Sequence, residues 1–375
     1  MKVIFARSPY TISIDEATQL GTKLELRLWH KGETKPTDPT YPFSLKNPSV
    51  TQTENIYNIA PFIKEFIGHV NPDLTNVVAG FEEENAGNWC LIEVKTYYDS
   101  IGTGITYTLI DTLDFVGVNG FTTYTGGANQ IEDDSLVYLC NDEINRTTNL
   151  GQPDFSTEDN IPYFNVICEW EANTGEELKI LYKDLALANL TTVVVLTDAD
   201  PAEIYNFKIP YRWDDVNYAL GNNVEVQDTN RVNRYNAFLY TTVEECKYTP
   251  VRCDYVNRFG GWETITFFKA RTDAYQFESK DFALLPDNWD YNPLRGEGKS
   301  FNHIAKQSVK LNTGWVEENF MVLLFDLMAS ETILLDNISS KIITKSTPVK
   351  TAIKDKMINY EIDFEYNFNL INNTQ

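Results

Sequence analysis

The side chains that most often perform catalysis or bind metal ions are sparse and scattered in this sequence. The three histidines, His30, His69 and His303, lie far apart, and none has a cysteine within a few residues. The cysteines are odd in number and irregularly spaced, and they form neither a Cys-x-x-Cys pair nor a Cys/His cluster of the kind that binds zinc. The sequence therefore predicts no metal ion, no cofactor, and reduced, buried thiols that pack as small apolar groups. These thiols belong to Cys90, Cys140, Cys168, Cys246 and Cys253.

Acidic residues are abundant, but none stands out as a catalytic acid or base. Among 54 Asp and Glu, a pair spaced for glycoside hydrolysis is always available, and nothing singles one out. The run Glu82-Glu83-Glu84 is typical of a solvated loop. Asp198-Ala199-Asp200 lacks the further ligands of a calcium loop, which favours a turn before Pro201. Nucleophile-elbow, phosphate-loop and dinucleotide-binding patterns are missing from the sequence. We therefore predict no catalytic residues and no enzymatic activity.

Aromatic residues near position 290 leave a second class of function open. Trp289 and Tyr291 lie in a stretch rich in Pro, Asp and Asn, where exposed rings could stack on sugars. The alternative is that these rings fill a small apolar cluster beneath their own loop. Glycan binding, and glycan hydrolysis with it, therefore stay as alternatives to a purely structural role.

Charge and composition exclude several other classes of protein. The net charge is −23, so the chain should repel the phosphates of nucleic acids and the anionic surfaces of membranes. Hydrophobic residues make up 42% and aromatic residues 13%, which argues against disorder. Stretches of roughly 18 apolar residues, the length of a membrane span, do not occur, and the first residues lack a signal-peptide core. We expect synthesis in a cytosol-like compartment, with no specific nucleic-acid binding and no membrane insertion.

The dominant pattern is the two-residue alternation of half-buried strands. In residues 23–29, three leucines alternate with Lys23, Glu25 and Arg27, and residues 360–368 alternate in the same way. Residues 252–256 and 262–268 predict a hairpin, because Gly260-Gly261 supplies the positive φ of a tight turn. The sequence thus predicts a mainly β fold of antiparallel β-sandwich domains, with one flanking α-helix in the C-terminal domain. Further strands are expected at 89–97, 163–170, 178–182, 192–196 and about 301–311.

Two segments have helical periodicity, residues 60–67 and residues 315–330. The second segment follows Asn312-Thr313-Gly314, three residues that can cap a helix. One face of this helix should cover its own sheet, namely Val316, Phe320, Leu323, Leu324 and Leu327. The opposite side carries a second apolar set, and such a helix requires burial on more than one side. A neighbouring segment of the chain, another subunit or a shorter helix would each account for this set. These interface candidates are Met321, Val322, Phe325 and Met328.

A basic segment stands out in this acidic chain. Residues 337–356 contain five lysines and a single acid, Asp355. One interpretation is a solvated loop whose edge lysines block aggregation. The other is a contact with an acidic surface of a neighbouring subunit, for which Lys341, Lys345 and Lys350 are the candidates.

Composition shifts suggest three domains, at residues 1–128, 129–270 and 271–375. The first boundary follows a stretch rich in Gly, Thr and Asn at 117–130, and the second falls where Pro286, Pro293, Gly296 and Gly298 interrupt an irregular region. We expect an N-terminal β-sandwich module, a central β domain, and a C-terminal β domain that contains the helix at 315–330.

Several stretches resemble structural virion proteins of phages that infect Bacteroidota, including the crAss-like phages. Residues 6–47, which contain Arg7-Ser8-Pro9-Tyr10, together with residues 57–67, are similar to the N-terminal module of these proteins. The hairpin at 256–269 and the ending at 311–331 and 358–373 are similar to recurrent pieces of them. The resemblance covers about a third of the chain. It implies a tail, neck or baseplate component whose C-terminal domain resembles those of tail tubes and rings, and it assigns no site residues.

The first hypothesis is therefore a non-enzymatic phage structural protein, part of a tail-associated ring, collar or baseplate. It would be a homo-oligomer that contacts other virion proteins of the tail or neck, located in the tail region of the virion. Its alternatives are a receptor- or glycan-binding virion module and a virion-associated glycan hydrolase.

Overall fold

The computed structural model describes most of the chain as β-strands. The described residues are 2–17, 19–47, 53–68, 81–101, 104–123, 130–132, 137–141, 146–148, 163–171, 173–184, 186–210, 221–228, 234–242, 247–283, 294, 298–346 and 358–371. Within these ranges the α-helices are α1 (Ala60–Phe66) and α2 (Met321–Ala329), and none is long and apolar enough to cross a membrane. The prediction of a mainly β fold with one helix near the C-terminus is confirmed.

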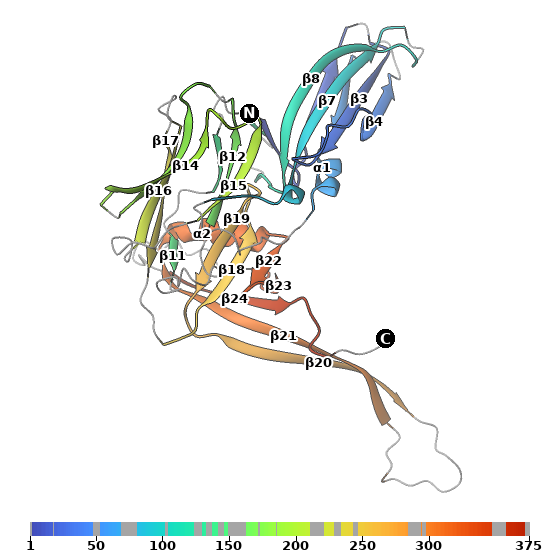
Figure 1. Ribbon diagram of the computed structural model, residues 1–375. Helices are drawn as coiled ribbons and strands as arrows, with labels where there is room; N and C mark the ends of the chain where they lie inside the picture. Colours follow the sequence, from blue (N-terminus) through green and yellow to red (C-terminus); the bar gives the residue numbers. More distant parts are fainter. Residues whose placement is uncertain are drawn as a thin grey trace, which may run out of the picture. The chain divides into compact units, whose positions relative to one another are not determined.

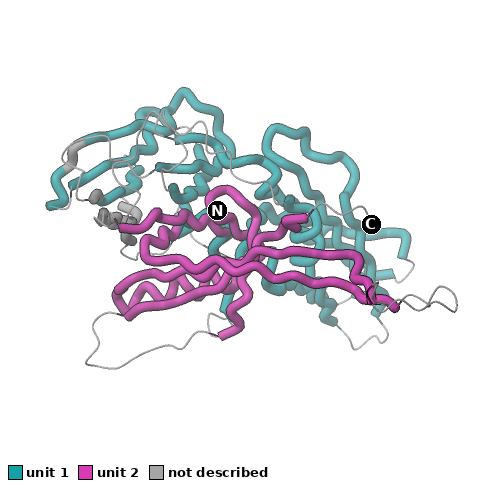
Figure 2. Tube along the Cα trace, turned by 90° about the horizontal axis from the view of Figure 1, so that it is seen from below, with its two compact units in different colours: residues 1–145, 152–241, 256–264 teal, residues 146–151, 242–255, 265–375 magenta. Residues whose placement is uncertain are grey.

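Contacts between residues divide the chain into two compact units. Unit 1 comprises residues 1–145, 152–241 and 256–264, and unit 2 comprises 146–151, 242–255 and 265–375 (Figure 2). The division into three domains after residues 128 and 270 remains a prediction.

The first part of unit 1 is a six-stranded sheet of order β4-β3-β7-β8-β1-β9, covered on one face by α1 and the pair β2–β5 (Figure 1). Leu24, Leu26 and Leu28 are buried beneath this cover, as the alternation predicted. The pairing of β1 with β8 is parallel, and the other pairings in the sheet are antiparallel. The strands are β1 (Lys2–Phe5), β2 (Thr11–Asp15), β3 (Gly21–Trp29), β4 (Tyr41–Lys46), β5 (Glu54–Asn58), β7 (Trp89–Asp99), β8 (Thr108–Val118) and β9 (Gln130–Glu132).

The second part of unit 1 is a β-sandwich. One sheet has the order β10-β12-β15-β6, and the facing sheet contains β17-β16-β13-β14. Phe164, Phe207 and Ile180 lie in the apolar cluster that both sheets share, so inward-facing residues of the two sheets form one core. The strands are β6 (Glu82–Glu83), β10 (Val137–Cys140), β12 (Tyr163–Glu169), β13 (Glu177–Lys183), β14 (Asn189–Thr197), β15 (Ile204–Pro210), β16 (Gly221–Asp228) and β17 (Arg234–Thr242); a short 3-10 helix spans Ala86–Asn88.

A third apolar cluster joins these two parts of unit 1. Val3, Trp89 and Val118 of the first part pack with Cys140 and Ile167 of the second. Residues on both sides of position 128 therefore share one core.

The acidic run Glu82-Glu83-Glu84 was expected in a solvated loop, and that expectation is wrong. Glu82 and Glu83 form β6, which pairs with β15. Glu84 is buried, and its carboxylate accepts hydrogen bonds from Asn165 Nδ2 at 2.9 Å and Asn88 Nδ2 at 2.8 Å. Amide donors replace the water that the carboxylate loses, so the acid can occupy the interior.

The tip of the predicted glycine hairpin is buried in unit 1. Strands β18 (Val251–Val256) and β19 (Trp262–Phe267) meet at Asn257, whose Oδ1 accepts from the N–H groups of Phe259 at 3.0 Å and Gly261 at 3.1 Å. Asn257 Nδ2 donates to the Cys140 carbonyl at 2.8 Å, and Trp262 N donates to Asn165 Oδ1 at 2.9 Å. One buried amide therefore closes the turn and attaches it to β10.

Unit 2 is built on a seven-stranded sheet of order β19-β18-β22-β23-β24-β21-β20. Leu323, Leu324 and Leu327 of α2 are buried, and Tyr255 Oη of β18 donates to the Leu323 carbonyl at 3.1 Å, which places the helix against the sheet. The strands not yet given are β11 (Arg146–Thr148), β20 (Thr272–Ala283), β21 (Gly298–Val316), β22 (Ile333–Leu335), β23 (Ile338–Ile342) and β24 (Ile358–Tyr366).

The helix predicted at 315–330 is shorter than expected. Strand β21 continues to Val316, a 3-10 turn follows at Glu318–Phe320, and α2 begins only at Met321. Asn312, Thr313 and Gly314, taken as helix caps, instead form a bulge against β24, with Gly314 at φ +73° and its N–H donating to Asn312 Oδ1 at 2.7 Å. A bulge uses the same residue types as a cap, because both require a local side-chain acceptor and a positive φ.

We predict that Asn257→Ala destabilises the protein by about 3 kcal/mol, because it removes the acceptor of the Phe259 and Gly261 N–H groups and the donor to the buried Cys140 carbonyl. Chemical denaturation followed by tryptophan fluorescence measures the effect. Gln276→Ala is the control, since the amide of the exposed Gln276 donates to the exposed Glu278 carboxylate at 3.3 Å. A loss below about 1 kcal/mol for both variants would contradict the role given to Asn257.

Candidate assembly surface

The most exposed regular structure in the described chain is the β20–β21 hairpin of unit 2. All twelve residues of β20 are exposed, and β21 is nineteen residues long. The two strands pair antiparallel from Thr272 opposite Lys310 to Ala283 opposite Gly298. They run side by side beyond the other strands of their sheet (Figure 1). We call β20 together with residues 298–310 of β21 the arm.

The arm carries aromatic side chains on both of its faces. Tyr275 and Phe277 are two residues apart on β20 and share one face, with exposures of 58% and 69%. Phe282 lies on the other face, where its ring meets that of Phe301 edge-on at 5.5 Å. Both faces therefore present apolar area that the described residues of the chain leave in water, as is typical of surfaces that bind another protein.

One bulge sets the twist of the arm. The register between the strands shifts between Glu278 and Lys280, and Asn302 on the opposite strand has a φ of +52°. Asn tolerates this left-handed conformation better than most residues. The bulge interrupts only the ladder between β20 and β21, so the outer edge of β20 continues past it.

The outer edge of β20 is the end of the seven-stranded sheet. Alternate backbone N–H and C=O groups along this edge point away from β21, and such an edge is a template for a further strand. Proteins usually shorten or block an edge of this kind with proline or several charges. Strand β20 is twelve residues long and has no proline, and its four charged residues include both signs, so a strand of complementary charge can still pair with this edge.

The base of the arm is fixed to β24 by ion pairs. Lys306 lies 3.6 Å and Lys341 2.7 Å from Glu365 Oε1, and Lys310 lies 3.2 Å from Glu361. The hydrogen bond from Lys341 holds the pKa of Glu365 below its ordinary value. On the same side of β21, Leu370 N donates to the Ala305 carbonyl at 2.8 Å. These contacts hold the base while the outer part of the arm has only its two strands.

Four of the predicted interface residues lie together on α2. Phe325 is 44% exposed, and Met321, Val322 and Met328 are half-buried. The inner set of Phe320, Leu323, Leu324 and Leu327 is buried, as expected. The division of this helix into a buried and a partly exposed side is therefore confirmed, and the role of the outer side as an interface remains a prediction.

The predicted lysines that the structure describes differ in their surroundings. Lys341 lies on β23 and its ammonium is paired with Glu365 of its own sheet, while Lys345 is exposed after the end of β23. Lys350 lies outside the described residues. The structure thus gives Lys341 a partner within the chain, which sequence spacing had not indicated.

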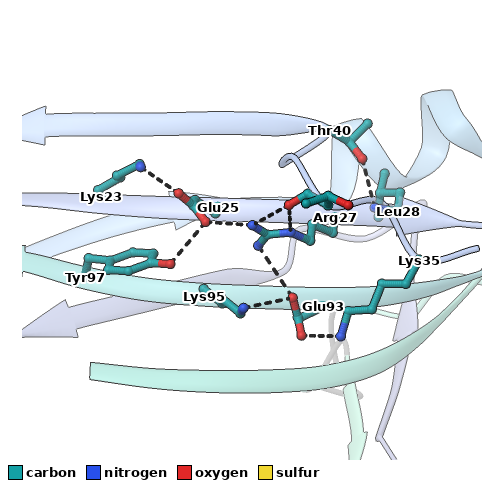
Figure 3. A network of polar contacts seen from close by, with 10 residues as sticks. Lys23, Glu25, Arg27, Leu28, Lys35, Thr40, Glu93, Lys95 and Tyr97 are labelled. Carbon is teal, nitrogen blue, oxygen red and sulfur yellow. Dashed lines mark hydrogen bonds and ion pairs between the residues drawn. The ribbon is translucent and has the colours of Figure 1, made fainter. Parts of the chain in front are cut away.

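A second concentration of polar groups lies on β3 and β7 of unit 1 (Figure 3). The Glu25 carboxylate is bound by Lys23 Nζ at 2.6 Å, Arg27 Nη2 at 3.0 Å and Tyr97 Oη at 3.1 Å. Burial raises the pKa of Glu25, but these three hydrogen bonds outweigh it and leave the pKa below its ordinary value.

The neighbouring carboxylate is held in the same way. Glu93 lies opposite Arg27 in the register and is bound by Lys35, with Arg27 at 3.5 Å and Lys95 at 3.6 Å. Burial raises its pKa, and the cations outweigh burial and lower it. A general acid requires a raised pKa, so this arrangement is suited to holding strands together rather than to proton transfer.

Other candidates for chemistry are occupied by structural contacts. Asp198 Oδ2 accepts from Gly175 N at 3.0 Å and Asp200 Oδ2 from Thr197 N at 2.8 Å, which confirms the predicted turn. Cys90 and Cys140 are buried as predicted, and burial raises the pKa of both thiols. Within the described ranges no group of His, Cys, Asp and Glu could bind a metal ion. Trp289 and Tyr291 lie outside those ranges, as do His69 and Cys246.

An open pocket of about 410 Å³ in unit 2 is lined by Tyr248, Thr249, Lys269, Ala270 and Arg271. Its cations already have neighbours: Arg271 lies 3.2 Å from Asp273, and Lys269 lies over the Phe268 ring. The pocket therefore presents little free charge to a ligand.

The fold and the arm thus define a mainly β protein with an exposed two-stranded projection. No protein-family model matches the chain, and no curated protein matches it either.

Sequence reasoning predicted a strand at about 301–311, which lies in β21, but it missed β20, because residues 272–283 lie between the predicted boundary at 270 and the irregular region near Pro286. Their apolar residues switch faces between Phe277 and Phe282, so no single face reads as buried. The usable signal was the spacing of two between Tyr275 and Phe277 in a stretch without Gly or Pro.

We predict that Arg27→Met lowers the free energy of unfolding by about 2–3 kcal/mol at pH 7, because both carboxylates lose a cation. The lowered pKa values of Glu25 and Glu93 mean that this stabilisation is present above the ordinary carboxyl range, near pH 4, and is lost as pH falls through the lowered values. The difference between the variant and the original chain should therefore shrink toward pH 3.

Denaturant titrations at pH 7 and pH 3 measure this difference. Lys46→Met is the control, because Lys46 is exposed at the end of β4 and should have little effect at either pH. A loss for Arg27→Met that is the same at both pH values would show that its packing, and not its charge, is what matters.

Proposed function

We propose that the protein is a non-enzymatic structural component of a phage virion, part of a tail-associated ring, collar or baseplate. The observation that carries the proposal is the arm: a strand of twelve exposed residues at a sheet end, with aromatic rings on both faces. A monomer gains nothing from such a strand, whereas an assembly buries it. The resemblance to virion proteins of Bacteroidota phages supports the same conclusion.

The polar groups of the described residues support assembly over catalysis. The buried carboxylates Glu25, Glu84 and Glu93 are held by cations or amides in structural networks. These carboxylates are engaged within the fold, and the contacts that the exposed surface offers a partner are strand pairing, apolar contact and charge complementarity.

Further contacts would complete such an assembly. The outer side of α2, with Phe325 at its centre, and the exposed Lys345 are the next candidates for contact with neighbouring copies or with other virion proteins. We propose synthesis in the host cytoplasm and incorporation into the tail region of the virion.

We predict that Tyr275→Ser together with Phe277→Ser leaves the protomer folded and weakens assembly by about tenfold or more, because exposed aromatic residues often dominate an interface. Circular dichroism reports folding, and electron microscopy with sedimentation reports assembled particles. Ile56→Ser is the control, since Ile56 is 57% exposed on β5 of unit 1 and lies outside the arm.

Two results would count against the proposal. Release of reducing sugars from host capsular polysaccharide would indicate a hydrolase. Binding of that polysaccharide by a protein that never assembles and is missing from tail density in a virion map would indicate a receptor-binding module.

A further inference from the structure

We propose that β20 pairs antiparallel with β20 of a second copy of this chain, with Ser279 on the two-fold axis. The pairing would join the two arms into one continuous four-stranded sheet. This inference rests on the proposed assembly function and names the partner and register of the arm.

The register follows from symmetry and charge. A two-fold axis perpendicular to the sheet keeps each residue on the same face in both copies, so residues of equal parity lie opposite each other. With Ser279 on the axis, Glu278 lies opposite the partner's Lys280, and Lys280 lies opposite the partner's Glu278. Two pairs of opposite charge therefore form on one face.

The nearest alternative registers place like charges together. A shift of the axis by one residue sets Glu278 opposite the partner's Glu278, or Lys280 opposite the partner's Lys280. A further shift sets Asp273 opposite the partner's Asp281, or Asp281 opposite itself. Directly opposed like charges are unfavourable, so the sequence of β20 selects the axis at Ser279 over its neighbours.

Side-chain size agrees with this register. Tyr275 lies opposite the partner's Ala283, and Phe282 lies opposite the partner's Gln276, so each ring faces a side chain that leaves it room. Phe277 lies opposite the partner's Asp281 and diagonal to the partner's Ala283, so its ring borders one acid and one small residue.

The charge of the arm favours a second copy as the occupant. The chain as a whole has a net charge of −23, so most surfaces of two copies repel each other. Strands β20 and β21 contain three acids, Asp273, Glu278 and Asp281. Of the four lysines in these strands, Lys306 and Lys310 are paired with Glu365 and Glu361 of β24, and Lys280 and Lys299 lie in the outer part of the arm. On β20 itself, Glu278-Ser279-Lys280 is self-complementary in charge about its centre, which is the place where two copies of an acidic protein can approach closely.

Cross-linking tests the register directly. Directly opposite residues of an antiparallel pair have Cα atoms about 4.5–5.5 Å apart, within the range of a disulfide. Ser279→Cys should therefore give a covalent dimer on oxidation. Gln276→Cys is the matched control, because in this register its counterpart lies roughly 20 Å away along the strand. Both variants carry Cys246→Ser, since the four cysteines within the described ranges are buried.

Charge reversal tests the pairing without cysteine. Glu278→Lys sets lysines opposite each other twice and should weaken self-association about tenfold at low salt, since each like-charge pair is destabilising. Adding Lys280→Glu to it restores opposite charges and should restore association to near its original level. Sedimentation equilibrium measures both, with circular dichroism to confirm that each variant is folded.

The outcomes separate this inference from the proposed function. Failure of Ser279→Cys to cross-link, or cross-linking through Gln276→Cys instead, overturns the register. Charge reversal that is not rescued by the second change overturns the pairing. If the Tyr275/Phe277 variant still fails to assemble in that case, the arm binds a different partner and the proposed function stands. A cross-linked dimer of a chain that is missing from virion tails would leave the pairing intact and overturn the virion assignment.

Discussion

The structure depends on the burial of one turn, Asn257 to Gly261, in the core of unit 1. Asn257 satisfies two N–H groups of its own turn and one carbonyl of β10, and there is no space for a side chain at Gly261, where a Cβ would lie 2.6 Å from Cβ of Cys140. The strands that leave this turn, β18 and β19, are the first two strands of the sheet in unit 2. A single hairpin thus belongs to both units, with its tip in one and its base in the other.

The edge strands of the described sheets differ in length, in proline content and in burial. At the end of the six-stranded sheet, β4 is six residues long and contains Pro42, which removes one edge donor. At one end of the seven-stranded sheet, every residue of β19 is buried. At the other end, β20 is long, exposed and free of proline. The two ends of the seven-stranded sheet therefore differ: β19 is covered, and β20 is exposed along its whole length.

The sequence predicted the helices and strands that have a periodic apolar pattern. It missed the features that depend on residues distant in the sequence. Alternation located β3, β7, β12 and β13, and the Pro and Gly around residues 60–68 located α1, although β3 and β12 are buried on both faces. Asn312-Thr313-Gly314 predicted a helix start and forms a bulge, since caps and bulges use the same local chemistry. Strand β20 was missed because a strand with both faces exposed leaves no buried stripe in the sequence, whereas the strand predicted at about 301–311 is part of β21. The ion pairs beside the base of the arm were equally hard to predict, since Lys341 of β23 lies next to Glu365 only through the register of β23 and β24.

Strand pairing at such an edge supplies specificity more readily than affinity. The backbone groups of a free edge are already hydrogen-bonded to water, so each new bond between strands contributes only about 1 kcal/mol net. An exposed pair of opposite charges adds about 0–1 kcal/mol, and its value falls with salt. The register is nevertheless well defined, because slipping by one step replaces attraction with repulsion at Glu278 or Lys280.

A two-fold contact also ends at two copies, so a ring requires a second, head-to-tail surface on each copy. The two-fold and head-to-tail contacts can each be weak and still give a stable closed ring. Each later contact forms between copies that the earlier contacts already hold together, so its effective concentration is high. An exposed arm of modest strength therefore suits a subunit that must stay soluble alone and become fixed only in a complete assembly.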